Sequence, residues 1–327
     1  MKILKATSQA IKKAGLIIQN GGLVAFPTET VYGLGADALN PLAVARIFEV
    51  KNRPRFDPLI VHIDSLSEIE RLCLEVDDRA RKLIQKFLPG PLTLVLPKSS
   101  LVPDIVTAGL PTVAIRMPSH PVALELIKEA KTPIAAPSAN LFGRLSPTTA
   151  EHVKDQIGKK IDLILDGGKT TLGVESTVIS FTEDDARLLR PGGLPLEEIE
   201  RVIGEVKILR QNIKKPQSPG QLPRHYSPRT PLRILTKDVV IEKGIKVGYL
   251  AFKQPKKKLP YEIVEVLSPE GDLREAAANL FSCLHRLDES DLDVIYAEPV
   301  PEKGLGRAIM DRLRRATSED IQNIKEF

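Results

Sequence analysis

Short apolar runs alternate with segments of helical spacing through the first two thirds of the chain. Runs of Val, Ile and Leu bounded by turn residues are typical of strands, and apolar residues that recur every three or four positions are typical of helices. This pattern predicts strands at 23–26, 59–63, 92–96, 112–117, 133–136, 163–165, 176–181 and 187–190. It predicts helices at 7–20, 41–51, 79–87, 121–130, 147–157 and 196–203.

Two of these helices have a clear start signal. Asn40 precedes Pro41, and Ser146 precedes Pro147. A capping side chain followed by proline is favoured at a helix N-terminus, because proline lacks the N–H that the first turn leaves unpaired. We therefore expect these helices to begin at the two prolines. Helices do not separate every pair of strands, so residues 1–211 are predicted to form an α/β domain with a twisted mixed sheet rather than a strictly parallel one.

The composition changes between residues 212 and 231. Prolines stand at 216, 219, 223, 228 and 231, a density that excludes helix and central strand. The segment is either a plain linker or, because it carries His225 and Tyr226, a lid over a site. Beyond it, strands at 246–252, 263–267 and 294–296 and helices at 272–287 and 306–317 predict a small Rossmann-like domain over residues 232–327.

Composition and charge narrow the choice of function. The chain has 327 residues, with 42% hydrophobic and 27% charged, as expected for a globular protein. A net charge of +5 suits an anionic ligand or an RNA partner, but the absence of Trp leaves no evident stacking platform for single-stranded nucleic acid. The five histidines show no metal-ligand spacing. No apolar stretch is long enough for a membrane helix and no signal peptide is visible, so we expect a cytoplasmic protein.

Cations and hydroxyls gather near the predicted strand ends. Examples are the run from Phe26 to Gly35, the triplet Lys51-Asn52-Arg53, and Arg190 followed by Pro-Gly-Gly. Such side chains bind phosphates and suit nucleotidyl or phosphoryl transfer, in which the protein mainly positions reactants and neutralises charge. Gly168-Lys169-Thr170 is not a P-loop, since residue 163 is leucine where that motif has its first glycine.

Taken together, these motifs resemble the YrdC family in its long two-domain form. The matching segments are 22–34, 51–53, 89–93, 113–118, 138–140, 175–177, 190–192, 218–220, 224–228 and 311–316, which span nearly the whole chain. The resemblance implies an α/β catalytic domain of the YrdC type, a linker and a small Rossmann-like domain. Two positions depart from the family: Asp57 stands where Asn is usual, and Gln221-Leu-Pro223 where Met-Lys-Tyr is common.

The resemblance also implies the activity. ATP, L-threonine and bicarbonate would give L-threonylcarbamoyl-AMP and pyrophosphate, with Mg²⁺ bound alongside ATP, for the threonylcarbamoylation of tRNA next to the anticodon. Hand-off to a tRNA threonylcarbamoyltransferase is expected, without stable nucleic-acid binding. The alternative is an RNA-binding module that uses the basic face of the first domain, although low aromatic content and the lack of an RNA-binding motif count against it.

The resemblance assigns roles to individual residues. Lys51 and Arg53 are the expected catalytic residues, holding the triphosphate. ATP would contact Arg53, Asp57, Thr112, Ser138, Asn140, Ser146, Arg190 and Tyr226, with Asp57 accepting from ribose or helping to hold magnesium. Threonine would contact Thr30, His62, Arg116, Ala136 and Ser176. Because Arg116 follows apolar residues in a buried strand, the sequence itself indicates that this guanidinium needs an anionic partner.

Overall fold

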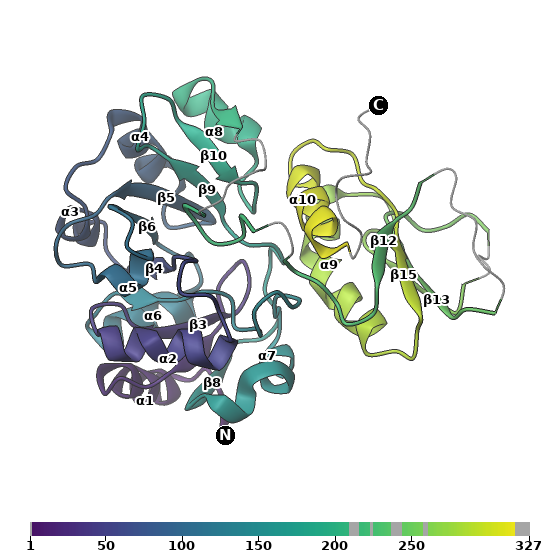
Figure 1. Ribbon diagram of the computed structural model, residues 1–327, viewed down its shortest axis with the longest axis horizontal. Coiled ribbons are helices and arrows are strands. Elements are labelled where there is room, and N and C mark those ends of the chain that lie inside the picture. Colours follow the sequence, from purple (N-terminus) through teal and green to yellow (C-terminus); the bar gives the residue numbers. More distant parts are fainter. Residues whose placement is uncertain (1, 209–215, 223–224, 237–243, 258–260, 318–327) are drawn as a thin grey trace.

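The computed structural model describes residues 2–208, 216–222, 225–236, 244–257 and 261–317. In Figure 1 two α/β bodies lie side by side, the larger built from the first part of the chain and the smaller from the last. They are joined by an extended segment that includes residues 216–222 and 225–231. The domain boundary at 211 falls outside the described residues and stays a prediction.

One mixed sheet forms the centre of the larger body. Its strands are β1 (Ile3–Lys5), β2 (Val24–Phe26), β3 (Gly33–Asp37), β4 (Ile60–His62), β5 (Leu92–Pro97), β6 (Thr112–Arg116), β7 (Ile134–Ala135), β8 (Leu163–Asp166), β9 (Thr177–Ser180), β10 (Arg187–Arg190) and β11 (Lys207–Ile208). Their spatial order is β1-β8-β2-β3-β7-β4-β6-β5-β9-β10-β11. Parallel pairs such as β4 with β6 alternate with antiparallel pairs such as β5 with β6, which confirms the predicted mixed sheet.

Helices pack on this sheet through their apolar stripes. They are α1 (Ser8–Gln19), α2 (Pro41–Lys51), α3 (Ser67–Leu72), α4 (Asp78–Phe87), α5 (Asp104–Thr107), α6 (Pro121–Ala130), α7 (Ala150–Ile157) and α8 (Leu196–Ile203). The structure adds β1, β3, α3, α5 and β11 to the elements that the pattern predicts, together with the short 3-10 helix η1 (Gly158–Lys160) and, in the smaller body, β12 (Leu232–Ile234). The pattern does not predict β3, because glycines at positions 33 and 35 weaken its strand signal. In the structure Gly35 lies so close to Phe26 and Ile134 that a Cβ there would be within 2.8 Å of both side chains.

The predicted start of α7 is wrong. The helix begins at Ala150, and its cap is Thr149, whose hydroxyl accepts from the backbone N–H of His152 at 3.3 Å. Ser146 has another partner, since its hydroxyl donates to a carboxylate oxygen of Glu175 at 2.5 Å. The other start signal is confirmed, because Asn40 caps α2 with Pro41 in the first turn.

The smaller body is a parallel sheet with two helices. Its strands are β12 (Leu232–Ile234), β13 (Val247–Ala251), β14 (Ile263–Val266) and β15 (Val294–Ala297), in the order β12-β15-β13-β14. Each pair is parallel, as the Rossmann-like prediction requires. Figure 1 shows α9 (Leu273–Asp288) and α10 (Gly306–Ala316) on the side of this sheet that faces the larger body.

The two bodies pack closely along α9. Gly173 lies so near this helix that a Cβ at that position would stand 2.4 Å from the carbonyl oxygen of Ala277. The hydroxyls of Thr148 and Ser282 are 3.0 Å apart, and Nε2 of His285 lies 3.2 Å from the carbonyl oxygen of Ser146. The smaller domain therefore rests directly on the loops that precede β9.

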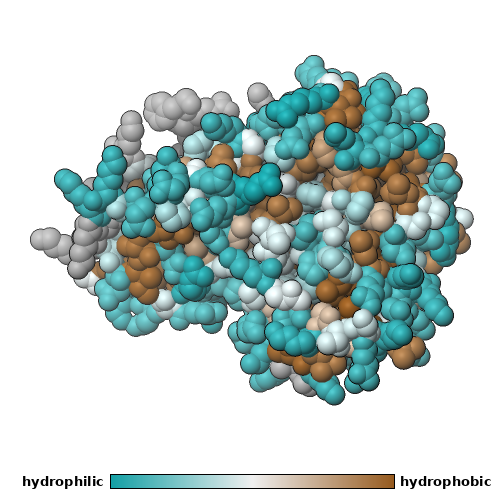
Figure 2. All heavy atoms as spheres, turned by 180° about the vertical axis from the view of Figure 1, so that it is seen from behind, coloured by the Kyte–Doolittle hydropathy of each residue, from teal (hydrophilic) through white to brown (hydrophobic). Residues whose placement is uncertain are grey.

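The molecular surface is mainly polar on the face seen in Figure 2. Hydrophilic side chains cover most of this face, and the hydrophobic ones form scattered patches between them. Within the described part of the chain, no helix combines the length and apolar character that crossing a bilayer requires. Cys73 and Cys283 are buried free thiols.

Candidate active site

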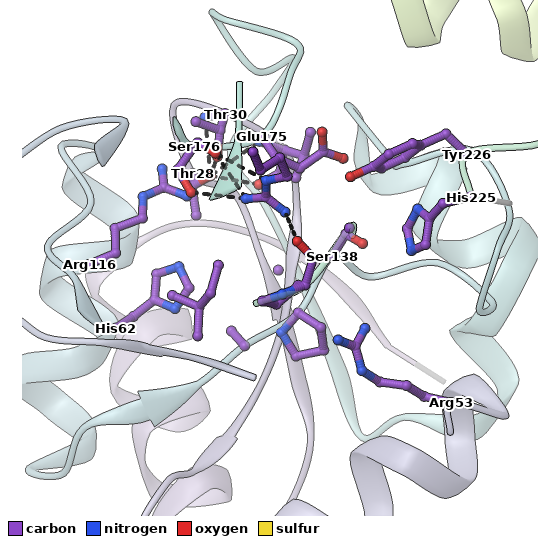
Figure 3. A pocket seen from close by; sticks show the side chains of 18 residues that line it. Thr28, Thr30, Arg53, His62, Arg116, Ser138, Glu175, Ser176, His225 and Tyr226 are labelled. Carbon is purple, nitrogen blue, oxygen red and sulfur yellow. Dashed lines mark hydrogen bonds between the residues drawn. The ribbon is translucent and has the colours of Figure 1, made fainter. Parts of the chain in front are cut away.

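A cavity opens beside the carboxyl ends of β4 and β6. These strands are parallel, with His62 opposite Arg116 in register, so both side chains reach the same edge of the sheet. The cavity is lined by Thr28, Thr30, Val31, Gly33, Arg53, Ile60, His62, Arg116, Ala136, Pro137, Ser138, Glu175, Ser176, Arg190, Pro219, Gly220, His225 and Tyr226. Figure 3 shows Arg116 and His62 on one side, His225 and Tyr226 on the other, and Ser138 between them.

Arg116 is held by the carboxylate of Glu29, which the sequence pattern does not single out as a site residue. One of its terminal nitrogens donates to Oε1 of Glu29 at 2.6 Å, and the other oxygen of Glu29 accepts from the backbone N–H of Ser119. Nε of Arg116 is buried and has no hydrogen-bond partner among the residues that the structure describes. Arg116 thus has a fixed orientation and a free donor.

His62 is neutral in this setting. Burial, followed by the nearby charge of Arg116, lowers the pKa of His62 to about 3. Its Nδ1 is buried without a hydrogen-bond partner, and its ring packs edge-on against Phe26 at 6.3 Å between centroids. A neutral imidazole beside a fixed guanidinium can donate or accept one hydrogen bond without adding charge.

Arg190 ties the end of β10 to the start of β9 and to the linker. Its Nη2 donates to the carbonyl oxygen of Ser176 at 2.9 Å, and its Nη1 to the carbonyl oxygen of Pro219 at 3.1 Å. The hydroxyl of Ser176 also lies 2.7 Å from that of Thr93. Because carbonyl dipoles only partly offset a guanidinium charge, Arg190 keeps its attraction for an anion in the cavity.

Arg53 is paired with Asp57, the residue that departs from the family. Nη2 of Arg53 lies 2.9 Å from Oδ2 of Asp57, and both side chains are almost completely buried. The contact lacks hydrogen-bond geometry, and both carboxylate oxygens of Asp57 are without a hydrogen bond. Burial raises the pKa of Asp57, although Arg53 and Lys51 oppose that shift.

Lys51 supports the loop beneath the cavity. Its Nζ donates to the carbonyl oxygens of Ser138 and Asn140, at 2.6 Å and 2.5 Å. Burial, followed by the charge of Arg53, lowers the pKa of Lys51 well below its usual range. The structure therefore gives Lys51 a positioning task in which it shapes the loop that carries Ser138.

The structure brings most of the predicted residues together, but not all of them. Among the ATP contacts expected, Arg53, Ser138, Arg190 and Tyr226 line the cavity, and so do all five expected threonine contacts, Thr30, His62, Arg116, Ala136 and Ser176. Lys51, Asp57, Thr112, Asn140 and Ser146 are not among the lining residues. Thr112 lies at the opposite end of β6 from Arg116, so the strand itself separates it from the cavity. Asn140 donates to the carbonyls of Leu141 and Arg144 and braces its own loop.

The linker forms one wall of the cavity. Tyr226 is 1% exposed, with φ at +62°, and its hydroxyl is buried without a hydrogen-bond partner. The sequence departs from the family at 221–223. The side chain of Gln221 accepts hydrogen bonds from the backbone N–H groups of Gln217 and Ser218. Residue 223 lies outside the described residues. The proline-rich segment is thus part of the site, and the interpretation as a plain spacer fails.

Three carboxylate and hydroxyl groups were missed as site residues: Thr28, Glu29 and Glu175. Thr28 and Glu29 stand inside the Phe26–Gly35 run, so their position was the available signal.

Burial would raise the pKa of Glu175, but Arg312 and then Arg190 outweigh it and lower that pKa, which keeps the carboxylate ionised. Across the described residues, no group of three or more His, Cys, Asp and Glu side chains could hold a metal ion.

Comparison with known proteins decides the family. Residues 16–192 match the Sua5/YciO/YrdC family, which is described as telomere recombination, and residues 194–318 match the threonylcarbamoyl-AMP synthase C-terminal domain. The chain belongs to the Sua5/YrdC family. A threonylcarbamoyl-AMP synthase of Pyrococcus abyssi is 50% identical over 323 residues, covering 95% of each chain. One of Bacillus subtilis is 44% identical, covering 96% of this chain and 94% of its own.

A solved member of the Sua5/YrdC family has the same fold over the whole length. The crystal structure of P. abyssi Sua5 in complex with L-threonine superposes with a TM-score of 0.91, at 47% identity, covering 97% of this chain and 98% of that one. The two-domain arrangement of this chain is therefore that of the long Sua5 proteins.

Proposed function

We propose that this enzyme makes L-threonylcarbamoyl-AMP and pyrophosphate from ATP, L-threonine and bicarbonate, and that the cavity described above is its active site. The observation that carries the proposal is the convergence of Arg53, Arg116 and Arg190 on one cavity that Thr and Ser hydroxyls also line. Fixed guanidinium groups in a site removed from water stabilise the charge that develops as a phosphoryl group is transferred.

The two sides of the cavity suit different substrates. Arg116 offers its free Nε, and neutral His62 stands beside it, an arrangement that fits the carboxylate of threonine or the carbamate made from it. Arg53 and Tyr226 lie on the other side of the cavity (Figure 3), and Arg190 donates to the linker carbonyl of Pro219. A triphosphate and its nucleoside would meet two cations and an aromatic ring there. The P. abyssi structure holds L-threonine, which supports the first assignment.

The chemistry follows in two steps. The neutral amine of threonine attacks the carbon of bicarbonate or carbon dioxide and forms a carbamate, with loss of water from bicarbonate or of a proton when carbon dioxide reacts. A carbamate oxygen then attacks the α-phosphorus of ATP, the bond to the β-phosphate breaks, and pyrophosphate leaves. The cavity favours this by holding both reactants in line and by spreading the negative charge over its arginines.

Mg²⁺ would enter with ATP. It keeps several waters and is usually bound through phosphates and one or two carboxylates, so it does not need the dedicated cluster that the described residues lack. Glu175 is the ionised carboxylate at the cavity wall and is the residue that would meet such an ion, directly or through water. The ion would neutralise charge on the phosphates.

Pyrophosphate release tests the proposal. Purified protein is incubated with ATP, Mg²⁺, bicarbonate and one amino acid at a time, and pyrophosphate is measured. We expect release with threonine and little with valine, which is nearly isosteric but lacks the hydroxyl. Equal release with every amino acid, or none with threonine, would overturn the synthase assignment.

The product would serve tRNA modification in the cytoplasm through a threonylcarbamoyltransferase. The alternative, an RNA-binding module, has less support, because the cationic side chains at the site lie inside a cavity and are buried rather than spread over a face. Tight tRNA binding without turnover in the same preparation would favour that alternative.

A further inference from the structure

One charged side chain of the smaller domain, Arg312, contacts the wall of the active site. Arg312, on α10, is 1% exposed, and its Nε donates to Oε2 of Glu175 at 2.7 Å. Its Nη1 donates to Asp311 at 2.5 Å on the same helix. A guanidinium that is completely buried at a domain boundary has a fixed position, because moving it would leave charge unpaired on both sides.

Glu175 connects this contact to the cavity. Its second carboxylate oxygen accepts from the hydroxyl of Ser146, and its carbonyl oxygen accepts from the backbone N–H of Gly193. The next residue, Ser176, lines the cavity and is held by Arg190. With Arg312 on one oxygen and Ser146 on the other, the Glu175 carboxylate has a single orientation.

The same guanidinium also lies over the linker. The Cζ of Arg312 is 4.8 Å from the ring centroid of Tyr226, a cation–π contact. One turn later, Arg315 donates to the carbonyl oxygen of Leu222 and accepts from the backbone N–H of His225. The helix α10 therefore sets the path of the linker on both sides of the two undescribed residues 223–224.

We propose that Arg312 is a positioning residue for the adenylation reaction: by holding the Glu175 carboxylate and the Tyr226 ring at once, it makes the smaller domain a working part of the active site. This rests on the proposed function. Arg312 does not itself line the cavity, so it acts through these two residues. Loss of the contact would displace the wall and lower turnover without removing any group that touches substrate.

A double-mutant cycle tests this directly. The variants Arg312→Gln, Glu175→Gln and the pair together are compared with the unaltered protein for kcat/KM in threonine-dependent pyrophosphate release and for Tm. We expect Arg312→Gln to lower kcat/KM about 100-fold when Glu175 is present, but less than about 3-fold when Gln stands at position 175. The paired variant should regain much of the lost Tm, since neither charge is left unpaired, but should not regain turnover.

Arg314→Gln is the matched control, because Arg314 lies on the same helix and pairs with Glu302 at the surface. It should leave both readouts unchanged. If Arg312→Gln does not fold, Arg312→Lys enters the cycle in its place, since it keeps a charge opposite Glu175 but not the planar stacking.

Each outcome has a defined reading. If Arg312→Gln has the kcat/KM of the unaltered protein, the positioning role is wrong. It is also wrong if the fold-changes in kcat/KM caused by Arg312→Gln and by Glu175→Gln simply multiply in the paired variant. Recovery of turnover together with Tm in the paired variant would mean that the ion pair serves stability alone, which also overturns it. Absence of pyrophosphate release by the unaltered protein would instead overturn the proposed function.

Discussion

At the scale of single residues, two arginines at or behind the site have carboxylate partners from distant parts of the chain, whereas Arg53 is paired with Asp57 four positions away. Glu29 holds Arg116 across 87 positions, and Glu175 meets Arg312 across 137. The motifs were therefore sufficient to predict the chemistry of the arginines, but no local pattern could predict that Glu29 and Glu175 would be the partners of Arg116 and Arg312. Thr112 lies at the other end of β6 from Arg116 and does not line the cavity, so its expected contact with ATP stays a prediction.

Arg53 illustrates how a ligand-binding residue also supports the fold. Arg53→Ala would leave the carboxylate of Asp57 buried with no hydrogen bond, and with only the weaker influence of the Lys51 and Arg190 charges. We expect the free energy of unfolding to fall by about 3–5 kcal/mol, as when one partner of a buried ion pair is removed. Urea denaturation measures this loss.

Two further variants separate charge from size at this position. Adding Asp57→Asn to Arg53→Ala should recover a large part of the lost stability, because the unpaired charge is gone. Arg55→Ala, at an exposed position of the same loop, should change stability by less than about 0.5 kcal/mol. If Arg53→Ala lowers the free energy of unfolding by a similar amount with Asp57 and with Asn at position 57, lost packing rather than the unpaired charge is responsible.

At the scale of elements, most helices and strands follow from apolar spacing and start signals. The exception at α7 has a specific cause: Ser146 is engaged with Glu175, so the cap passes to Thr149. Sequence spacing finds candidate caps, but it cannot tell when a tertiary contact has taken the capping side chain. Sequence spacing also fails to reveal β3, because its glycines give a weak strand signal and the strand is stabilised by pairing with β2 and β7.

The loop before β9 offers a matched test of domain packing. Gly173 and Gly168 both have positive φ, at +70° and +85°, but a Cβ would strike α9 only at Gly173. Both alanine variants share the backbone strain, so their difference isolates the clash. We expect Gly173→Ala to cost about 1–3 kcal/mol more than Gly168→Ala in urea unfolding, and to lower threonine-dependent turnover as well. Equal losses of unfolding free energy in the two variants would mean that α9 shifts to accommodate the added methyl group at almost no cost.

At the scale of the whole molecule, all five histidines have a lowered pKa, with burial as the largest cause at each. For His62 and His152 the lowered pKa is about 3. As pH falls below about 6.5, the unfolded chain takes up protons at these sites and the folded chain does not. Stability is therefore retained above pH 6.5 and is lost progressively as pH falls toward 3.

This gives a prediction for acid denaturation. Between pH 7 and pH 5, His62 alone should remove about 2 kcal/mol of unfolding free energy, because only the unfolded state is protonated there. Urea unfolding at a series of pH values measures the slope, and the His62→Gln variant should show a shallower one. A slope that is the same in both proteins would mean that His62 is protonated in the folded state.

The shared apolar cluster around Tyr226 has a consequence for the chain as a unit. Val31, Leu145 and Val174 of the larger body pack in one cluster with Leu280, Phe281 and other side chains of the smaller body. Separating the two bodies at the linker would expose an apolar surface on each of them to water, and the free-energy cost would grow with the area exposed. Burial of this cluster therefore holds the two bodies together in addition to the linker, and neither body could be exchanged without a change in the face that it would expose.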